Sequence, residues 1–141
     1  MSQPRIGQKV VVDVPATTAN LGPGFDCLGA ALDLNNRFAM RRIEGNGERF
    51  ELIIEGTEGS HLRGGPDNLV YRAAQRVWKA AGLEPVALEA RVRLAVPPAR
   101  GLGSSATAIV AGLMGANALV GDPLSKEKLL ELAIDLSLIH I

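Results

Sequence analysis

Residues 88–120 read LEARVRLAVPPARGLGSSATAIVAGLMGANALV, and this stretch decides the fold. Apolar and charged residues alternate over positions 88–96, which predicts a strand with one buried face, and Pro97-Pro98 are expected to end it. After a glycine-rich loop, a segment that is apolar nearly all round runs from position 104 or 105 to position 120. It predicts a helix in the middle of a packed structure.

The helical part of this stretch has no charged residue between Arg100 and Asp122, a gap long enough to raise the question of a bilayer span. Glycine, serine, threonine and asparagine dilute the run, and no basic cluster flanks it to set an orientation. We therefore interpret the segment as a buried helix and expect no membrane partner.

Two more strands are expected upstream. Lys9–Pro15 is apolar at successive positions, which predicts burial on both faces, and Pro15 is expected to end its pairing. Residues 50–54 carry apolar side chains at alternate positions, which predicts a strand with one wet face. A Gly-Asn-Gly turn at residues 45–47 precedes this strand, so we expect a hairpin there.

Two amphipathic helices are also expected, which gives an α+β chain. Asp67 or Asn68 can cap the first helix, whose inward face lies within residues 70–81, and Gly82 would close it. Ser125 can cap the second helix. The inward face of that helix is expected to consist of Leu129, Leu130, Ala133 and Leu136.

Length and composition limit the classes of protein. The chain has 141 residues, 47% of them apolar and 21% charged, which indicates one globular domain or a piece of a larger one. Fifteen basic and fifteen acidic residues give a net charge of zero, which argues against a nucleic-acid partner. A single cysteine, Cys27, and a start without the pattern of a secretory signal favour a cytoplasmic location.

The loop at residues 97–105 joins the strand to the buried helix, an arrangement that suits anion binding. Gly101 and Gly103 let backbone N–H groups approach phosphate oxygens, and the helix N-terminus adds unpaired N–H groups and about half a positive charge. Ser104 and Ser105 add hydroxyls for phosphate or for Mg²⁺. A plain strand-to-helix turn with a serine cap is the alternative interpretation.

The same glycines, with Ala106, also fit the G-x-G-x-x-A spacing of a dinucleotide fingerprint. However, Pro97-Pro98 separate the glycines from the strand, and the next expected element is a helix instead of another strand. No Lys follows Gly103, so the P-loop pattern fails. A dinucleotide-binding oxidoreductase domain is thus a competing but disfavoured function.

A second loop, PATTANLGPGFD at residues 15–26, has hydrogen-bonding side chains among glycine and proline. Thr17, Thr18, Asn20 and Asp26 could hold donors and acceptors at fixed positions around a small polar substrate. The alternative is an ordinary network of Asx and ST turns, with Asp26 capping a helical turn.

Two motifs in this order, VPATTANLGPGFDCLGAALDL at residues 14–34 and PPARGLGSSATA at residues 97–108, strongly resemble the homoserine kinase family of the GHMP kinase superfamily. The second motif is shared across the superfamily, whereas the first is similar to homoserine kinases in particular. PDNLV at residues 66–70 resembles the family's segment near the adenine. Thr18 stands where the family often has Ser, which keeps a hydroxyl.

The resemblance implies the GHMP-kinase N-terminal domain, an α+β fold of the ribosomal protein S5 domain 2-like type with a left-handed βαβ feature. It implies a truncated ATP-binding domain over residues 1–136, a tail at residues 137–141 that does not match the family, and the absence of the C-terminal domain. The acidic Mg²⁺ ligand would then lie outside this chain. We expect such a fragment alone to be inactive and to expose an apolar face.

The implied function is ATP-dependent phosphorylation of the hydroxyl of L-homoserine to O-phospho-L-homoserine, a step of threonine biosynthesis, and a homodimer is one arrangement for the full-length enzyme. Thr18, Asn20 and Asp26 would bind the substrate, with Asp26 as the catalytic residue that either orients the hydroxyl or takes its proton. Ser105 would be the ligand of Mg²⁺. The residues expected to bind ATP are Asn68, Pro98, Ala99, Arg100, Gly101, Leu102, Gly103, Ser104, Ser105, Ala106, Thr107 and Ala108. Another small-molecule GHMP kinase and a catalytically inactive nucleotide-binding fragment are the alternatives.

Overall fold

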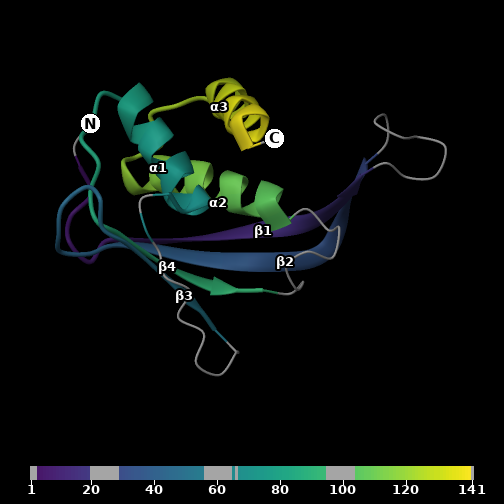
Figure 1. Ribbon diagram of the computed structural model, residues 1–141, viewed down its shortest axis with the longest axis horizontal. Coiled ribbons are helices and arrows are strands. Elements are labelled where there is room, and N and C mark those ends of the chain that lie inside the picture. The colour runs from purple at the N-terminus through teal and green to yellow at the C-terminus, as the bar shows by residue number, and fades with distance from the viewer. Residues whose placement is uncertain (1–2, 20–28, 56–64, 66, 95–103, 141) are drawn as a thin grey trace.

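The computed structural model describes residues 3–19, 29–55, 65, 67–94 and 104–140. Figure 1 shows their arrangement. In chain order the elements are β1 (Lys9–Ala19), β2 (Gly29–Arg42), β3 (Phe50–Ile54), α1 (Leu69–Ala80), β4 (Leu88–Arg93), α2 (Ser104–Leu119) and α3 (Lys126–His140).

The strands form one sheet in the order β1-β2-β4-β3, and the three helices lie on the same side of it (Figure 1). β2 runs antiparallel to both of its neighbours, whereas β3 and β4 are parallel and α1 connects them. This βαβ unit and the single helical layer confirm the α+β class.

β1 differs from its prediction in length and in burial. It continues through Pro15 to Ala19, with a shift of register between Pro15 and Thr17. β1 is an edge strand, and a proline, which lacks an N–H for pairing, is tolerated on such a strand. Val11 is 52% exposed and Val14 is buried, so burial on both faces was wrong and the strand has one core face.

The hairpin expected at residues 45–47 is also wrong, because β4 lies between β2 and β3 in the sheet. The sequence reasoning had missed β2, which supplies the antiparallel partner of both β1 and β4. Its core-facing side chains are Asn36, Phe38 and Met40, at alternate positions. The strand expected over residues 88–96 is described as β4 only to Arg93.

α2 is the central helix, and two glycines explain how closely it approaches its neighbours. A Cβ at Gly112 would lie 2.4 Å from the Val70 carbonyl oxygen in α1, and a Cβ at Gly115 would lie 2.2 Å from the sulfur of Met40 in β2. Glycine is therefore required at position 112, where the obstacle is backbone, whereas a Cβ at position 115 would force the Met40 side chain to move. The prediction of a helix buried on most sides is confirmed, and α2 ends at Leu119, one residue earlier than expected.

α1 and α3 begin at their predicted caps. Asn68 precedes α1, and its side chain accepts a hydrogen bond from the Val70 N–H at 2.9 Å. Ser125 Oγ accepts from the Lys128 N–H at 3.2 Å. The inward face of α3 was partly wrong: Leu130 is 61% exposed, and Leu132 takes the buried position. Positions 129, 132, 133 and 136 follow the i, i+3, i+4, i+7 spacing of one helical face more closely.

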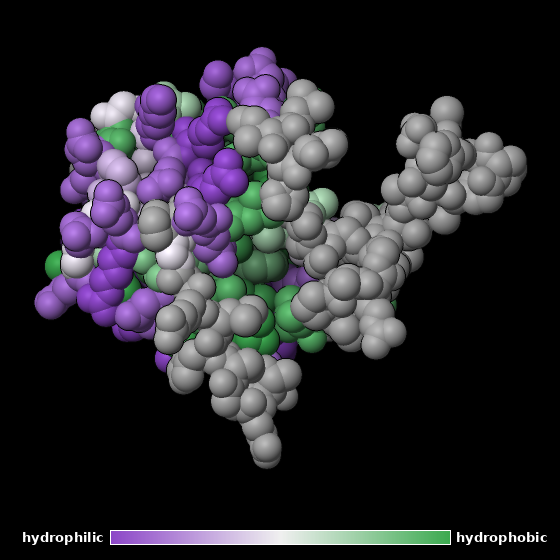
Figure 2. Space-filling model, in the orientation of Figure 1, coloured by the Kyte–Doolittle hydropathy of each residue, from purple (hydrophilic) through white to green (hydrophobic). Residues whose placement is uncertain are grey.

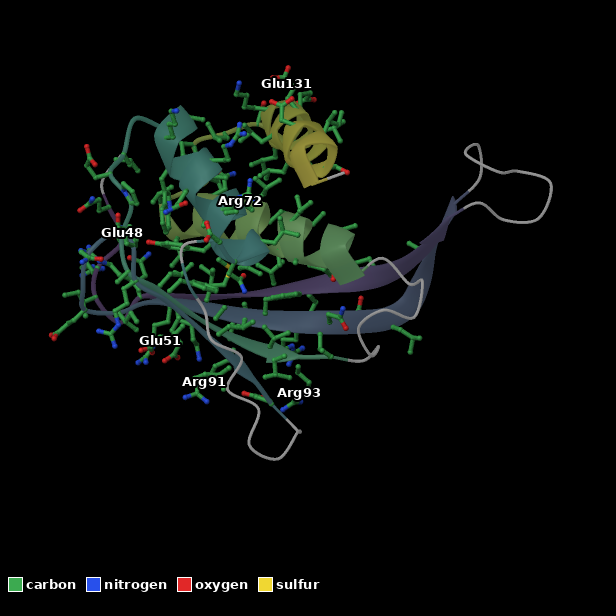
Figure 3. The ribbon with its side chains drawn as sticks, in the orientation of Figure 1. Glu48, Glu51, Arg72, Arg91, Arg93 and Glu131 are labelled. Carbon is green, nitrogen blue, oxygen red and sulfur yellow. The ribbon has the colours of Figure 1, made fainter. Side chains whose placement is uncertain are left out.

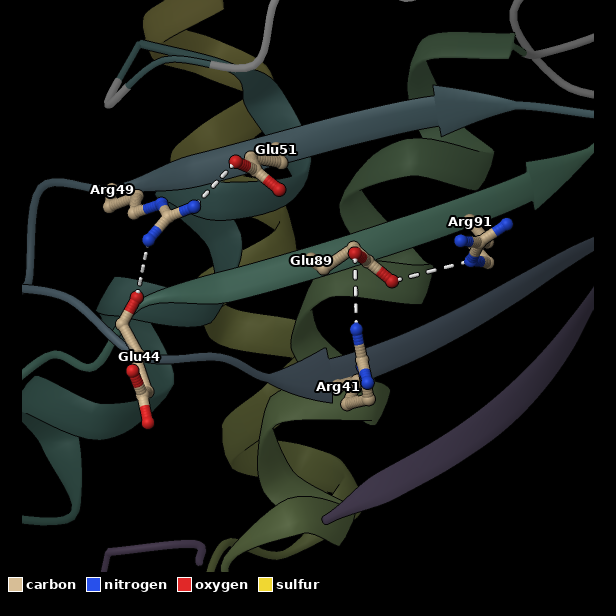
Figure 4. A network of polar contacts seen from close by, with 6 residues as sticks. All are labelled: Arg41, Glu44, Arg49, Glu51, Glu89 and Arg91. Atoms are coloured by element: carbon tan, nitrogen blue, oxygen red, sulfur yellow. Dashed lines mark hydrogen bonds and ion pairs between the residues drawn. The ribbon is translucent and has the colours of Figure 1, made fainter. Parts of the chain in front are cut away.

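The sheet face away from the helices is polar and crossed by ion pairs. Arg37 Nε lies 2.8 Å from Asp13 Oδ1 on the neighbouring strand, and this hydrogen bond holds the pKa of Asp13 below its usual value. Glu89 accepts from Arg41 and from Arg91 at 3.3 Å each, and is buried beneath them (Figure 4). Arg91 and Glu51 project on the side opposite the helices (Figure 3). These ion pairs make the outer face of the sheet polar, and apart from Glu89 their side chains are exposed.

An apolar surface remains on the helical side, as expected. Met114 of α2 is 46% exposed, and Leu130 and Ile134 of α3 are more than half exposed. In Figure 2 apolar residues are exposed over the middle of the face shown, with hydrophilic ones to their left. A groove of about 280 Å³ between the two helices is lined mainly by Val110, Leu113, Met114, Leu129, Leu130 and Ala133. None of the helices in the described ranges is long and apolar enough to cross a membrane.

Candidate functional site

A cavity of about 180 Å³ lies where the N-termini of α1 and α2 approach β3 and β4. Its walls are largely apolar, and two polar side chains, Asn68 and Thr107, are among them. The residues that line it are Phe38, Leu52, Ile54, Asn68, Leu69, Val70, Val92, Leu94, Thr107 and Ala108. Ligand pockets for drug-sized molecules measure about 300–1,000 Å³, so this space alone fits one ring system of a larger ligand.

The sheet supplies the apolar wall. Phe38 belongs to β2, Leu52 and Ile54 to β3, and Val92 to β4, so three adjacent strands contribute. Their side chains face the helices because they alternate with residues on the charged outer face. A flat apolar wall with few hydrogen-bonding groups suits a planar heterocyclic base.

The start of α1 supplies the polar edge. Asn68 Oδ1 caps the helix, so the Nδ2 group is the part of that side chain that can donate to a ligand. Tyr71, in the first turn, anchors this end: its hydroxyl lies 2.6 Å from the Gly47 carbonyl oxygen and 2.7 Å from that of Val86. Burial raises the pKa of Tyr71 to about 12. The Tyr71 ring stacks on Phe50 with centroids 5.1 Å apart.

The start of α2 supplies the other side. The first turns of both helices adjoin the cavity, and each carries backbone N–H groups without intrahelical partners. Together with the helix dipole, these groups favour an anion near the cavity. Thr107 is only 2% exposed, and its Oγ1 accepts a hydrogen bond from Asn36 Nδ2 at 3.3 Å.

The structure brings together three of the predicted ATP-binding residues, Asn68, Thr107 and Ala108, around one cavity. Ala106 is exposed on the helix, and only the backbone is described for Ser104 and Ser105. The positions that lie outside the described residues are Asn20, Asp26, Pro98, Ala99, Arg100, Gly101, Leu102 and Gly103.

Only the backbone of Thr18 is described. Its backbone pairs with Ala30 near the end of the β1–β2 pair, which projects beyond the helices (Figure 1). The acceptor-binding role of Thr18, Asn20 and Asp26 therefore stays a prediction. The same holds for the Mg²⁺ ligand Ser105, and the described residues form no cluster of three or more His, Cys, Asp or Glu side chains.

Sequence reasoning missed the apolar wall and the buried Asn36. The alternation of residues 50–54 was interpreted as a strand, but nothing in it showed that Leu52 and Ile54 face a cavity. Asn36 could have been found, because it shares the inward positions of Phe38 and Met40 along β2, where a polar residue is unusual.

Comparisons with known proteins agree with this geometry. The family described as GHMP kinases N terminal domain matches residues 68–140. Over 136 residues the chain is 96% identical to a homoserine kinase of Synechococcus sp. (strain CC9605), covering 96% of this chain and 43% of that protein. The chain thus spans less than half the length of this curated relative.

Solved structures show the same arrangement. A homoserine kinase from Cytophaga hutchinsonii superposes with a TM-score of 0.78 at 29% identity, covering 96% of this chain and 43% of that one. The mevalonate kinase of Methanococcus jannaschii superposes with a TM-score of 0.71 at 15% identity, over 92% of this chain and 46% of that one. The second likeness concerns the fold alone.

Proposed function

The chain belongs to the GHMP kinase family by its N-terminal domain, and from this premise we propose that it provides the ATP-binding part of a homoserine kinase. The proposed reaction transfers the γ-phosphoryl group of ATP to the side-chain hydroxyl of L-homoserine. The observation that carries the proposal is the cavity in which Asn68, Thr107 and Ala108 meet beside the N-termini of two helices.

The cavity supports binding of the nucleotide base. Phe38, Leu52 and Ile54 offer an apolar surface, and the amide of Asn68 offers a donor at its edge. The volume of about 180 Å³ suits the base without the ribose and phosphates. Those parts of ATP would extend toward the N-terminus of α2.

The start of α2 supports binding of the phosphates. The predicted phosphate loop directly precedes α2 in the sequence, so its glycines would adjoin the N–H groups of the first turn of α2. Ser105 would hold Mg²⁺, which neutralises charge on the triphosphate. An acidic ligand from another part of the enzyme would complete that site.

The acceptor loop would complete the reaction. Asn20 and Asp26 would hold the homoserine hydroxyl, whose oxygen attacks the γ-phosphorus while the bond to ADP breaks. Asp26 either orients that hydroxyl or accepts its proton. Positioning and charge neutralisation, more than covalent chemistry, are what such a transfer requires.

The setting follows from the same proposal. O-phospho-L-homoserine would be the product, within threonine biosynthesis, and the enzyme would act in the cytoplasm. A balance of fifteen basic and fifteen acidic residues supports a small-molecule substrate over a nucleic acid. A homodimer of the full-length enzyme is part of the proposal.

A hybrid enzyme tests the function. In this hybrid, the chain replaces the matched segment of the Synechococcus sp. (strain CC9605) protein, to which it is 96% identical over 136 residues. Release of ADP is measured with homoserine, mevalonate and shikimate as separate acceptors. We expect release that depends on homoserine. A preference for mevalonate or shikimate would indicate another GHMP kinase, and binding of NADH without ADP release would favour an oxidoreductase.

A further inference from the structure

Asn36 is a buried polar residue on the core face of β2. It is 1% exposed, and its Nδ2 donates to Thr107 Oγ1 at 3.3 Å. The next inward-facing positions along the strand are Phe38 and Met40, both buried. Burial of an amide costs free energy unless its groups are hydrogen-bonded, so a polar residue at this position needs a reason beyond filling space.

The position of this bond within the fold suggests the reason. Asn36 lies on the strand that returns from residues 20–28, where the acceptor-binding residues are predicted. Thr107 lies in the first turn of α2, directly after the predicted phosphate-binding loop. Phe38, two residues further along β2 and on the same face, lines the nucleotide cavity. The hydrogen bond therefore joins β2, the strand that follows the predicted acceptor loop, to the start of α2, which follows the predicted phosphate loop.

The start of α2 carries only small side chains. The residues from position 104 to position 108 are two serines, two alanines and one threonine, all small. Ala106 is exposed and Ala108 is half-buried. A hydrogen bond fixes both the distance and the direction between the groups that it joins.

We propose that Asn36 is a positioning residue that acts through Thr107 to fix the phosphate-binding end of α2 relative to the β1–β2 hairpin. The inference rests on the proposed kinase function and assigns neither residue a role in the chemistry itself. In this role the Thr107 hydroxyl binds Asn36, while the residue also lines the cavity proposed for the nucleotide. Misplacement of the reacting groups by a small distance lowers turnover strongly. Loss of this bond therefore lowers kcat by more than any accompanying loss of folded protein explains.

The test uses the hybrid enzyme with Asn36→Leu, Thr107→Val and the double variant. Each single change removes this hydrogen bond from one side, whereas the double change replaces both of its groups by apolar ones of similar shape. We expect kcat to fall about tenfold in each variant, beyond what any loss of melting temperature accounts for. The losses in kcat should be non-additive, because the two residues act as one unit. Thr107→Ser should recover much of the activity that Thr107→Val loses.

Asn117→Leu provides the matched control at the far end of the same helix. Asn117 is equally buried, and its side chain exchanges hydrogen bonds with the Leu124 backbone at 3.0 and 3.1 Å. This variant should lose stability and keep its kcat. The inference is overturned if kcat falls in step with melting temperature across all variants, or if the double variant regains parental kcat.

The same experiment separates this inference from the proposed function. An active hybrid whose Asn36 and Thr107 variants keep parental kcat and KM overturns the positioning role alone. A parent hybrid without homoserine-dependent ADP release overturns the proposed function and the inference together.

Discussion

Replacement of Gly112 by Ala tests whether the contact between α1 and α2 sets the geometry of the cavity. A Cβ at this position would lie 2.4 Å from the Val70 carbonyl oxygen and 2.7 Å from Ala73 Cβ. Ordinary contact begins near 3.4 Å, so the carbonyl has to move by about 1 Å. Because that oxygen belongs to the backbone of α1, no side-chain rotation can relieve the clash. Val70 also lines the cavity proposed for the nucleotide, so the shift reaches that cavity.

Two opposing effects set the change in the free energy of unfolding. Ala is favoured over Gly in a helix interior by about 1 kcal/mol, whereas overpacking of a core contact costs about 1–3 kcal/mol. With a backbone atom as the obstacle, we expect the upper part of that range. Gly112→Ala should therefore lower the free energy of unfolding by about 1–2 kcal/mol net and also weaken the affinity for ATP.

The assay is urea unfolding of the hybrid enzyme followed by circular dichroism, with ATP affinity measured by calorimetry. Met114 is exposed on the same helix, so the difference between Met114→Gly and Met114→Ala measures the helix-propensity gain without a packing cost. If Gly112→Ala stabilises the protein by the same amount as that difference, α2 does not approach α1 as closely as described and the reasoning fails.

Four further changes test other parts of the account. Asn68→Ala should lower the free energy of unfolding by about 1 kcal/mol through loss of the helix cap, whereas Asn68→Asp keeps an acceptor for the Val70 N–H and should weaken only ATP binding. Raising the pH from about 9 to about 11 should lower the free energy of unfolding of the parent by about 1 kcal/mol more than that of Tyr71→Phe, as measured by urea titration. The pKa of Tyr71 near 12 in the folded state lies above the ordinary value of 10, so its ionisation favours the unfolded chain. Equal dependence on pH in the two proteins would contradict this. Gly103→Val should abolish binding of a non-hydrolysable ATP analogue in calorimetry, since a branched side chain blocks the approach of the backbone to phosphate, and unchanged affinity in a folded variant would refute the phosphate loop. Asp26→Asn should lower turnover of homoserine while ATP affinity stays near that of the parent, and parallel loss of both would mean that its loop is structural.

Local patterns predicted the elements whose environment is uniform along their length. The alternation before Arg93, the cap at Asn68 and the apolar helix α2 each follow from periodicity or from the chemistry of one cap residue. The strand order does not follow from such local patterns, because the neighbours of a strand depend on long-range pairing. For that reason β2 was missed and a hairpin was expected where β4 intervenes.

The site could be predicted in part for the same reason. Motif resemblance selected Asn68, Thr107 and Ala108, and the fold places all three at one cavity. The apolar wall from β2, β3 and β4 could not be anticipated, since it arises where three strands and two helices meet. Asn36 was missed because β2 itself was missed, and its partner Thr107 lies 71 positions away in sequence.

Phosphorus NMR of the hybrid enzyme with ATP, Mg²⁺ and L-homoserine tests the central claim most directly, because it identifies the product as well as the consumption of ATP. The account predicts a growing phosphomonoester signal, matched to ADP and split by coupling to the adjacent CH₂ group, and its loss in Gly103→Val. Formation of inorganic phosphate in place of that ester, or ADP formation that does not depend on homoserine, would contradict it.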